Sequence, residues 1–166
     1  MREAPDIGAA SDAPVIGVVS DTHAYYDPKL DESFAGVAHI VHAGDFGTFD
    51  VIERLRLLAP VTAVCGNVDR QCFLDQLPWE TEVTVAGLRI LVGHIGTSLV
   101  GLRDPVAEGI GMVVSGHSHR AAVEWRGETL FLNPGYAGRP RFAQRRSVAL
   151  VTVRDGVPKP EIVPLG

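Results

Sequence analysis

The chain has 166 residues, of which 46% are hydrophobic and 21% charged, and its formal net charge is −5. This length fits one compact domain, and the hydrophobic content excludes a disordered chain, which lacks the apolar mass needed to offset its ordering entropy. The negative charge argues against non-specific duplex binding, because such binding relies on many cations that neutralise phosphates. We therefore expect one globular domain with no dedicated nucleic-acid surface.

The amino terminus and the cysteines indicate a cytoplasmic protein. Glu3 and Asp6 interrupt the stretch where a signal peptide needs apolar residues, and no later run approaches the roughly 18 apolar residues of a membrane span. Cys65 and Cys72 are too few for a secreted disulfide framework and lack the C-x-x-C spacing of a zinc site. We expect no membrane contact, a disordered tail over 1–13 and a single domain over 14–166.

Short buried strands alternate with polar turns in the first half of the chain. The apolar runs 15–20 and 38–42 each predict a strand buried on both faces, and 49–58 carries apolar side chains at helical spacing. Pro60 closes this helix, and 61–65 predicts a third buried strand. Because a polar cluster follows each strand, polar side chains should gather where these strands end.

The second half is richer in strands. Residues 82–85 and 88–92 predict a hairpin, 112–115 predicts another buried strand, and 154–156 is typical of a hairpin tip. Further strands, joined by Gly and Pro turns, are predicted at 122–125, 129–132, 147–153 and 161–163. The mixed pattern predicts a layered α/β domain with helices outside and sheets inside.

Polar side chains directly follow five of the predicted buried strands. In folds of this class, ligands bind at the carboxyl ends of such strands. The polar residues are Asp21, His23, Asp45, Asn67, His94, His117 and His119. Two carboxylates, one amide oxygen and four imidazoles suit Mn, Fe, Zn or Ni and are poor for Ca. Seven donors exceed one ordinary site, whereas two ions about 3.5–4 Å apart, bridged by one carboxylate, would use them. Each residue alone has an ordinary structural explanation, so the prediction rests on their repeated placement after apolar runs.

The same residues lie in blocks that resemble those of the calcineurin-like metallophosphoesterases. The blocks are Ser20-Asp21-Thr22-His23, Gly44-Asp45, Gly66-Asn67-Val68-Asp69, Gly93-His94 and Gly116-His117-Ser118-His119. The short length and Asn133-Pro134-Gly135 are similar to the small bacterial and archaeal phosphodiesterase branch. The resemblance spans about 15–141 and implies a four-layer α/β/β/α sandwich of two mixed sheets flanked by helices.

The resemblance also implies a dinuclear metal site. One ion would take Asp21, His23, Asp45 and His119, and the other would take Asp45, Asn67, His94 and His117. An anionic Asp45 offsets the repulsion of two dications, and neutral imidazoles leave enough positive charge to acidify a bridging water. The expected reaction is hydrolysis of a phosphodiester by in-line attack of a metal-bridging hydroxide, with Asp45, Asn67 and His94 as catalytic residues. Manganese is the favoured metal, with Ni, Fe or Zn as alternatives.

Three positions depart from the family pattern. Val68 stands where many members have a histidine that acts as general acid, Ile95 replaces a small residue, and Tyr136 stands where serine often follows Asn-Pro-Gly. General acid catalysis commonly supplies roughly 10²–10⁴-fold, and its loss weighs most on alkyl monoesters, whose leaving group is strongly basic. We therefore expect phosphodiesters with activated leaving groups to be the better substrates; Asp69 or a metal-bound water is the alternative source of the proton.

Other polar residues have two interpretations each. The densest basic cluster comprises Arg139, Arg141, Arg145 and Arg146. Within it, Arg139 and Arg141 are candidate substrate contacts because a guanidinium matches phosphate geometry, although arginine also predominates over lysine throughout the chain. His42 either supports the loop of Asp45 or is an ordinary buried strand histidine.

Two other functions stay open at this point. One is phosphomonoesterase activity, and the other is a non-catalytic interaction scaffold of the same fold, which substitutions among the seven ligand positions would favour; none is substituted. The metallo-β-lactamase-like hydrolases are excluded, because their His-x-His continues into Asp-His whereas Arg120-Ala121-Ala122 follows here. The expected partner is a small phosphate-ester substrate, and the sequence leaves a homo-oligomer open.

Overall fold

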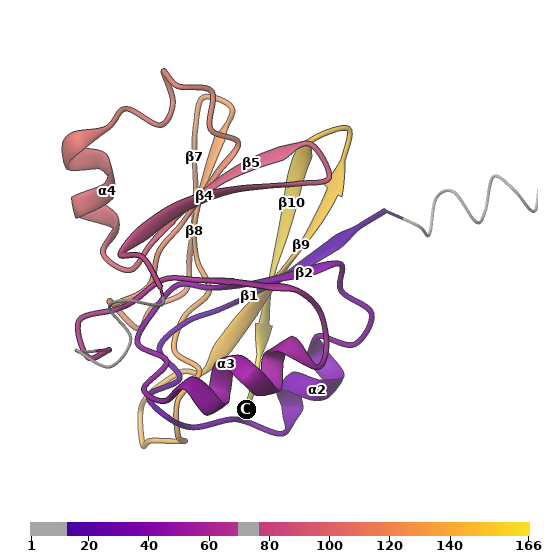
Figure 1. Cartoon of the computed structure of the whole chain (residues 1–166), viewed down its shortest axis with the longest axis vertical. Coiled ribbons are helices and arrows are strands. Elements are labelled where there is room, and N and C mark those ends of the chain that lie inside the picture. The colour runs from indigo at the N-terminus through magenta and orange to yellow at the C-terminus, as the bar shows by residue number, and fades with distance from the viewer. Residues whose placement is uncertain (1–12, 70–76) are drawn as a thin grey trace, which may run out of the picture.

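A computed structural model describes residues 13–69 and 77–166. Two five-stranded sheets lie against each other, with helices on their outer faces (Figure 1). The predicted sandwich of two mixed sheets flanked by helices is therefore confirmed. The expected tail over 1–13 lies almost wholly outside the described residues, and Cys72 lies outside them as well.

The first sheet has the strand order β10-β9-β1-β2-β3. Its centre is parallel: β1 (Val15–Val19) pairs with β2 (His39–His42), which pairs with β3 (Val61–Ala63). On the other side, β9 (Ser147–Arg154) is antiparallel to β1, and β10 (Val157–Pro164) is antiparallel to β9. The carboxyl ends of β1, β2 and β3 therefore share one edge of the sheet with the start of β9 and the end of β10.

The second sheet has the order β4-β5-β6-β8-β7. Here β5 (Leu88–Gly93), β6 (Met112–Val114) and β8 (Thr129–Asn133) are parallel. The outer strands β4 (Glu80–Val85) and β7 (Ala122–Arg126) are antiparallel to their neighbours. Both sheets are thus mixed, and each has three parallel strands whose carboxyl ends can carry ligands.

Alternation along the strands divides the hydrophobic residues between the layers. In β1, Ile16 and Val18 point into the core between the sheets, whereas Val15 and Val19 pack on the helix side. Helices α2 (Lys29–Ser33) and α3 (Phe49–Arg56) cover the first sheet (Figure 1). The second sheet is covered by α4 (Gly96–Leu102). Among the helices of the described residues, none combines the length and apolar character needed to cross a bilayer.

Two helices and part of one strand were not predicted from the sequence. Helix α2 has only five residues, and α4 includes Gly96 and Gly101, so neither carries a strong periodic signal. Strand β10 begins at Val157, earlier than predicted, although it contains prolines at 158, 160 and 164. The N–H groups of successive residues in a strand point to opposite sides, and all three prolines are at even-numbered positions. Leu165, at an odd-numbered position, donates its N–H to the Arg146 carbonyl on the side of β9. The missing proline N–H groups therefore face away from β9, which an edge strand tolerates.

Candidate metal centre

The seven predicted ligands lie at one edge of the sandwich, on loops that follow parallel strands. Asp21 and His23 follow β1, Asp45 follows β2, and Asn67 comes after β3. His94 follows β5, and His117 and His119 follow β6. Two groups of donor atoms within 4.8 Å of one another result: Asp21, His23 and His119, and Asp45, His94 and His117. Either group could hold a metal ion.

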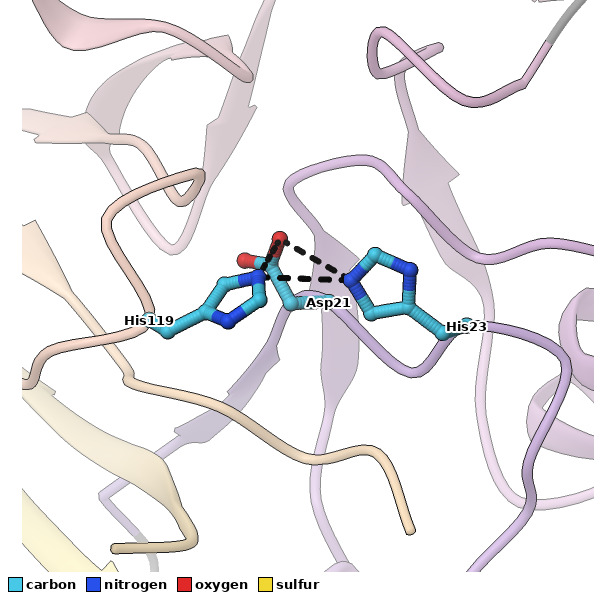
Figure 2. A group of neighbouring side chains, drawn as sticks. All are labelled: Asp21, His23 and His119. Atoms are coloured by element: carbon cyan, nitrogen blue, oxygen red, sulfur yellow. Dashed lines mark hydrogen bonds and ion pairs between the residues drawn. The ribbon is translucent and has the colours of Figure 1, made fainter. Parts of the chain in front are cut away.

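The first group places a buried carboxylate between two imidazoles (Figure 2). Asp21 Oδ1 lies 3.7 Å from His23 Nε2 and 3.3 Å from His119 Nε2, and the two Nε2 atoms are 3.3 Å apart. The Asp21 side chain is fully buried, whereas those of His23 and His119 are about a quarter exposed (26% and 27%). The carboxylate therefore forms the floor of the centre, and the imidazoles form its solvent-facing rim.

The second group joins the first through Asp45. Asp45 Oδ2 lies 3.1 Å from His94 Nε2 and 4.0 Å from His23 Nε2. His94 Nε2 is in turn 3.7 Å from Asp21 Oδ1. Asn67 Oδ1 lies 3.2 Å from His117 Nδ1, so the amide also reaches the cluster. All seven residues thus belong to one continuous centre, with the Asp45 carboxylate facing both groups.

Two buried atoms in this centre, Asp21 Oδ1 and His94 Nε2, lie 3.7 Å apart. Within the described residues, Asp21 Oδ1 and His94 Nε2 have no hydrogen-bond partner. His94 Nδ1 lies 2.8 Å from the Ala43 carbonyl, which can only accept, so Nδ1 carries a proton and, in the neutral imidazole, the Nε2 lone pair faces the carboxylates. Buried acceptors that face one another are costly unless positive charge lies between them. The donor set therefore fits divalent metal ions.

The pKa values of the buried pair indicate the same demand for positive charge. Burial lowers the pKa of His94, but contact with Asp45 and the charge of Asp21 outweigh it, so the His94 pKa is raised. Burial raises the pKa of Asp45, but contact with His94 and the Val68 N–H outweigh it, so the Asp45 pKa is lowered. Asp45 is therefore an anion at neutral pH, the state in which a carboxylate can bind a cation.

The backbone at the ligands is strained. Five of them have a positive φ, a region that residues other than glycine seldom occupy: Asp21 (57°), His23 (47°), Asp45 (57°), His117 (71°) and His119 (63°). Such conformations persist only when the surrounding structure holds them. One constraint is Gly66, where an added Cβ would lie 2.1 Å from Asp45 Oδ1. The residue at 66 must therefore be glycine for the Asp45 loop to reach its position.

Asp69 holds two of the ligand loops together. Its carboxylate accepts the N–H groups of Asp45 (2.7 Å), Phe46 (3.3 Å), Gly47 (2.9 Å) and Gly66 (2.8 Å), and its side chain is buried. Burial and the charge of Asp45 raise the pKa of Asp69, against the lowering effect of these bonds. Sequence reasoning did not assign this role, although the position of Asp69 two residues after Asn67 is a signal that could have found it.

His42 has a related role beneath the loops after β1 and β2. It is fully buried, its Nδ1 accepts the Gly44 N–H (3.1 Å), and its Nε2 lies 3.0 Å from Thr22 Oγ1. The Thr22 hydroxyl donates to the Phe46 carbonyl (3.2 Å). Burial lowers the pKa of His42 to about 3, so the imidazole is neutral. Of the two interpretations left open by the sequence, the structure favours support of the Asp45 loop.

The structure separates the members of the arginine cluster. Arg146 is buried, forms an ion pair with Asp27 and donates from Nε to the Gly138 carbonyl (2.8 Å), so it belongs to the framework. Arg139 and Arg141 are exposed. The Arg141 Cζ lies 5.3 Å from the centre of the Tyr136 ring, and this ring lies 4.9 Å from that of His119. Arg141 is therefore placed at the rim of the candidate centre.

Val68 contributes its backbone, not a proton donor, to the centre. Its N–H donates to Asp45 Oδ1 at 2.9 Å, and its side chain is 45% exposed. Both carboxylate oxygens of Asp69 accept backbone N–H groups, so Asp69 is not free to act as the proton donor in place of the missing histidine. The Tyr136 hydroxyl likewise donates to the Arg139 carbonyl (3.0 Å).

Comparisons with known proteins agree with this geometry. The family model for the calcineurin-like phosphoesterase superfamily domain matches residues 15–156. A probable metallophosphoesterase of Methanocaldococcus jannaschii is 31% identical over 153 residues, which are 85% of this chain and 77% of the relative.

Solved structures show the same fold. A protein described as a novel archaeal phosphodiesterase aligns with a TM-score of 0.71 and 20% identity over 90% of this chain and 99% of its own. Wild-type Vps29 of Entamoeba histolytica, complexed with zinc, aligns with a TM-score of 0.68 and 20% identity over 92% of this chain and 99% of its own. The chain therefore belongs to the calcineurin-like phosphoesterase superfamily.

Proposed function

We propose that the protein is a metal-dependent phosphodiesterase with two divalent ions at the candidate centre. The family implies a phosphoester hydrolase. The observation that carries the proposal is the pair of buried, unpartnered acceptors, Asp21 Oδ1 and His94 Nε2, in one cluster with Asp45. Divalent ions bound there supply positive charge that acidifies water and offsets the charge of a phosphoryl group. Mn is the favoured metal, ahead of Ni, Fe or Zn.

The chain's own residues prepare the site for this chemistry. Asp45 provides the negative charge that lets two cations lie close together. The Ala43 carbonyl fixes the tautomer of His94, so that Nε2 stays available as a donor atom. In this proposal Asn67, beside His117, donates from its amide to a phosphoryl oxygen, and Arg141, at the rim, binds another.

The preference for diesters follows from the surroundings of Val68. An exposed apolar side chain occupies the position where a histidine would protonate the leaving oxygen, and Asp69 and Tyr136 are committed to other hydrogen bonds. Alkyl monoesters, whose leaving groups need a proton most, are therefore disfavoured. A diester also carries one negative charge fewer than a monoester dianion, and its second substituent can contact apolar side chains at the rim.

A non-catalytic scaffold is the second candidate. The structural likeness to Vps29 supports it at the level of the fold. The enzyme is favoured instead because none of the seven donor positions is substituted and their side chains lie in one cluster.

The test is a substrate panel with Mn supplied. We expect bis(p-nitrophenyl) phosphate to be hydrolysed well, p-nitrophenyl phosphate less well and alkyl monoesters poorly. Val68→His should raise the monoesterase rate, while Val68→Ala, which also removes the valine but adds no donor, should not. A wild-type preference for alkyl monoesters would refute the diester assignment, and no turnover of any ester by metal-loaded protein would favour the scaffold.

A further inference from the structure

A cavity of about 640 Å³, in the size range of small-molecule sites, is lined in part by His119 of the candidate metal centre. Its walls include His119 and Arg120 after β6, Gln144 and Arg145 before β9, and Ile162 and Pro164 at the end of β10. None of the wall residues other than His119 belongs to the candidate metal centre.

The strand directions place this cavity at the same edge of the molecule as the metal centre. β9 starts, and β10 ends, at the edge where β1 delivers Asp21, because β9 is antiparallel to both of its neighbours. His119 belongs to both sites: its Nε2 lies 3.3 Å from Asp21 Oδ1, and the residue lines the cavity. The Gln144 side chain donates to the His119 carbonyl (3.2 Å) and so fixes the cavity wall to the ligand loop.

Three arginines line the cavity, against one carboxylate, that of the last residue, Gly166. Arg120, Arg145 and Arg146 line it, and no Asp or Glu does so among the described residues. Arg146 is committed to Asp27. Arg120 and Arg145 are exposed, and no ion pair or side-chain hydrogen bond of either is found within 13–69 and 77–166. Two guanidinium groups are therefore available to a ligand.

A second cavity of similar size differs from the first in its charge and in its position. It encloses about 690 Å³ at the opposite edge, where Gly87 and Gly156 turn the hairpins. Its walls include Arg89 together with Glu128, and Arg89 is already paired with Glu82 at 2.8 Å. Cavity volume alone thus does not distinguish the two, whereas the excess of arginines next to a residue of the candidate metal centre does.

Apart from Gln144, Ser147 and Gly166, the remaining wall of the first cavity is apolar and consists of Ala121, Ala143, Ile162 and Pro164. An apolar wall combined with two guanidinium groups suits a ligand with a neutral body and an anionic end, because guanidinium binds phosphate oxygens bidentately. A phosphodiester has two substituents, and only one of them leaves. Val68, at the position that would face the leaving oxygen, lies against Asp45 and does not line this cavity, so the cavity beside His119 is left for the substituent that stays on phosphorus.

We propose that this cavity binds the retained substituent of the substrate and selects one that carries a second phosphate, as a phosphorylated nucleoside does. Arg145 and Arg120 bind the remote phosphate, and the apolar wall contacts the nucleoside. The proposal rests on the phosphodiesterase function proposed above and adds its substrate class.

Two matched substrates test the proposal: the p-nitrophenyl ester of thymidine 5′-phosphate, with and without a 3′-phosphate. The leaving group and the scissile bond are identical, so their kcat/KM ratio reports the remote phosphate alone. We expect a ratio of roughly tenfold to a hundredfold in favour of the 3′-phosphorylated ester, as for one or two charge-assisted hydrogen bonds. The double variant Arg120→Ala/Arg145→Ala should bring this ratio close to one.

The matched control is Arg126→Ala, because Arg126 is also an exposed arginine but lies on β7, pairs with Glu124 and does not line this cavity. It should keep the wild-type ratio. A wild-type ratio near or below one, with good turnover of the unphosphorylated ester, would overturn the cavity proposal and leave the phosphodiesterase function intact. A high ratio that survives the double variant would also overturn it. No turnover of either ester would instead refute the phosphodiesterase function.

Discussion

The two edges of the sandwich use the same backbone conformation for different purposes. At the hairpin edge, Ala86 (φ 52°) and Asp155 (φ 53°) adopt the left-handed region where the chain reverses between β4 and β5 and between β9 and β10. At the metal edge, Asp21 (φ 57°) and Asp45 (φ 57°) adopt it where strands end in ligand loops. Residues in the left-handed region reverse the chain at the hairpin edge, whereas at the metal edge they orient the ligand side chains toward one another.

The surroundings of neighbouring glycines show how the edges differ. An added Cβ at Gly87, in the hairpin, would meet nothing within 4 Å, whereas one at Gly66 would lie 2.1 Å from Asp45 Oδ1. The hairpin is open, and its conformation is a local property of a short turn. The metal edge is packed, so its strained conformations depend on contacts between loops that are distant in sequence. Substitutions should therefore be tolerated at one edge and not at the other.

The largest expected effect comes from matched Asp→Asn changes at the two edges. Asp45→Asn removes the charge that faces both ligand groups, and kcat/KM for a phosphodiester should fall more than about 100-fold, beyond the usual cost of losing a residue that only supports a ligand. Asp155→Asn makes the same change at the same φ in an exposed hairpin, which Asn tolerates, and should leave activity unchanged. Normal metal content and turnover in Asp45→Asn would contradict the role given to Asp45.

Matched Gly→Ala changes come next. Gly66→Ala forces the Asp45 loop to move, and a displacement of about 1 Å at a reacting centre can cost about 10²-fold in kcat. Gly87→Ala imposes a side chain at φ +82° in open space, so it should cost about 1 kcal/mol of unfolding free energy and no activity. Equal losses of activity in the two variants, measured alongside urea unfolding, would show that packing does not distinguish the edges.

Asp69→Asn should have an intermediate effect. The amide keeps one acceptor oxygen but sets an NH₂ group against backbone N–H groups, which should loosen both ligand loops. We expect metal affinity to weaken about tenfold to a hundredfold, as is common for residues that hold ligands in place. Activity at saturating metal should recover much of the loss. An unchanged metal dissociation constant would limit Asp69 to a role in folding.

The smallest effect on activity is expected at His42, whose substitution should act on the pH dependence of stability. Burial lowers the pKa of His42 from 6.5 to about 3 in the folded chain, so below pH 6.5 the unfolded chain takes up a proton that the folded chain does not. Stability from neutral His42 is therefore complete above pH 6.5 and declines toward pH 3, by up to about 1.4 kcal/mol per pH unit. His42→Gln should flatten this slope in urea unfolding of metal-free protein. Parallel wild-type and variant curves would be inconsistent with a neutral buried His42.

The sequence predicted the elements whose signals are local. The runs at 15–20 and 112–115 are buried strands, and Asp155-Gly156 is a hairpin tip, because unbroken apolar stretches and turn residues identify them. The ligand loops were predicted for the same reason, since polar residues follow these runs directly. Helix α4 and the start of β10 were not, because glycines and prolines obscure the pattern and tertiary packing holds these segments in place. The role of Asp69 depends on four N–H groups from two loops, which only the folded arrangement brings together.

Metal content and turnover, measured on one sample, test the candidate centre most directly. We expect chelation to remove both metal and activity toward bis(p-nitrophenyl) phosphate, and added Mn to restore activity as two ions bind per chain. The buried acceptors on Asp21 and His94 are the structural reason for this expectation. Full turnover by protein shown to contain no metal would contradict it.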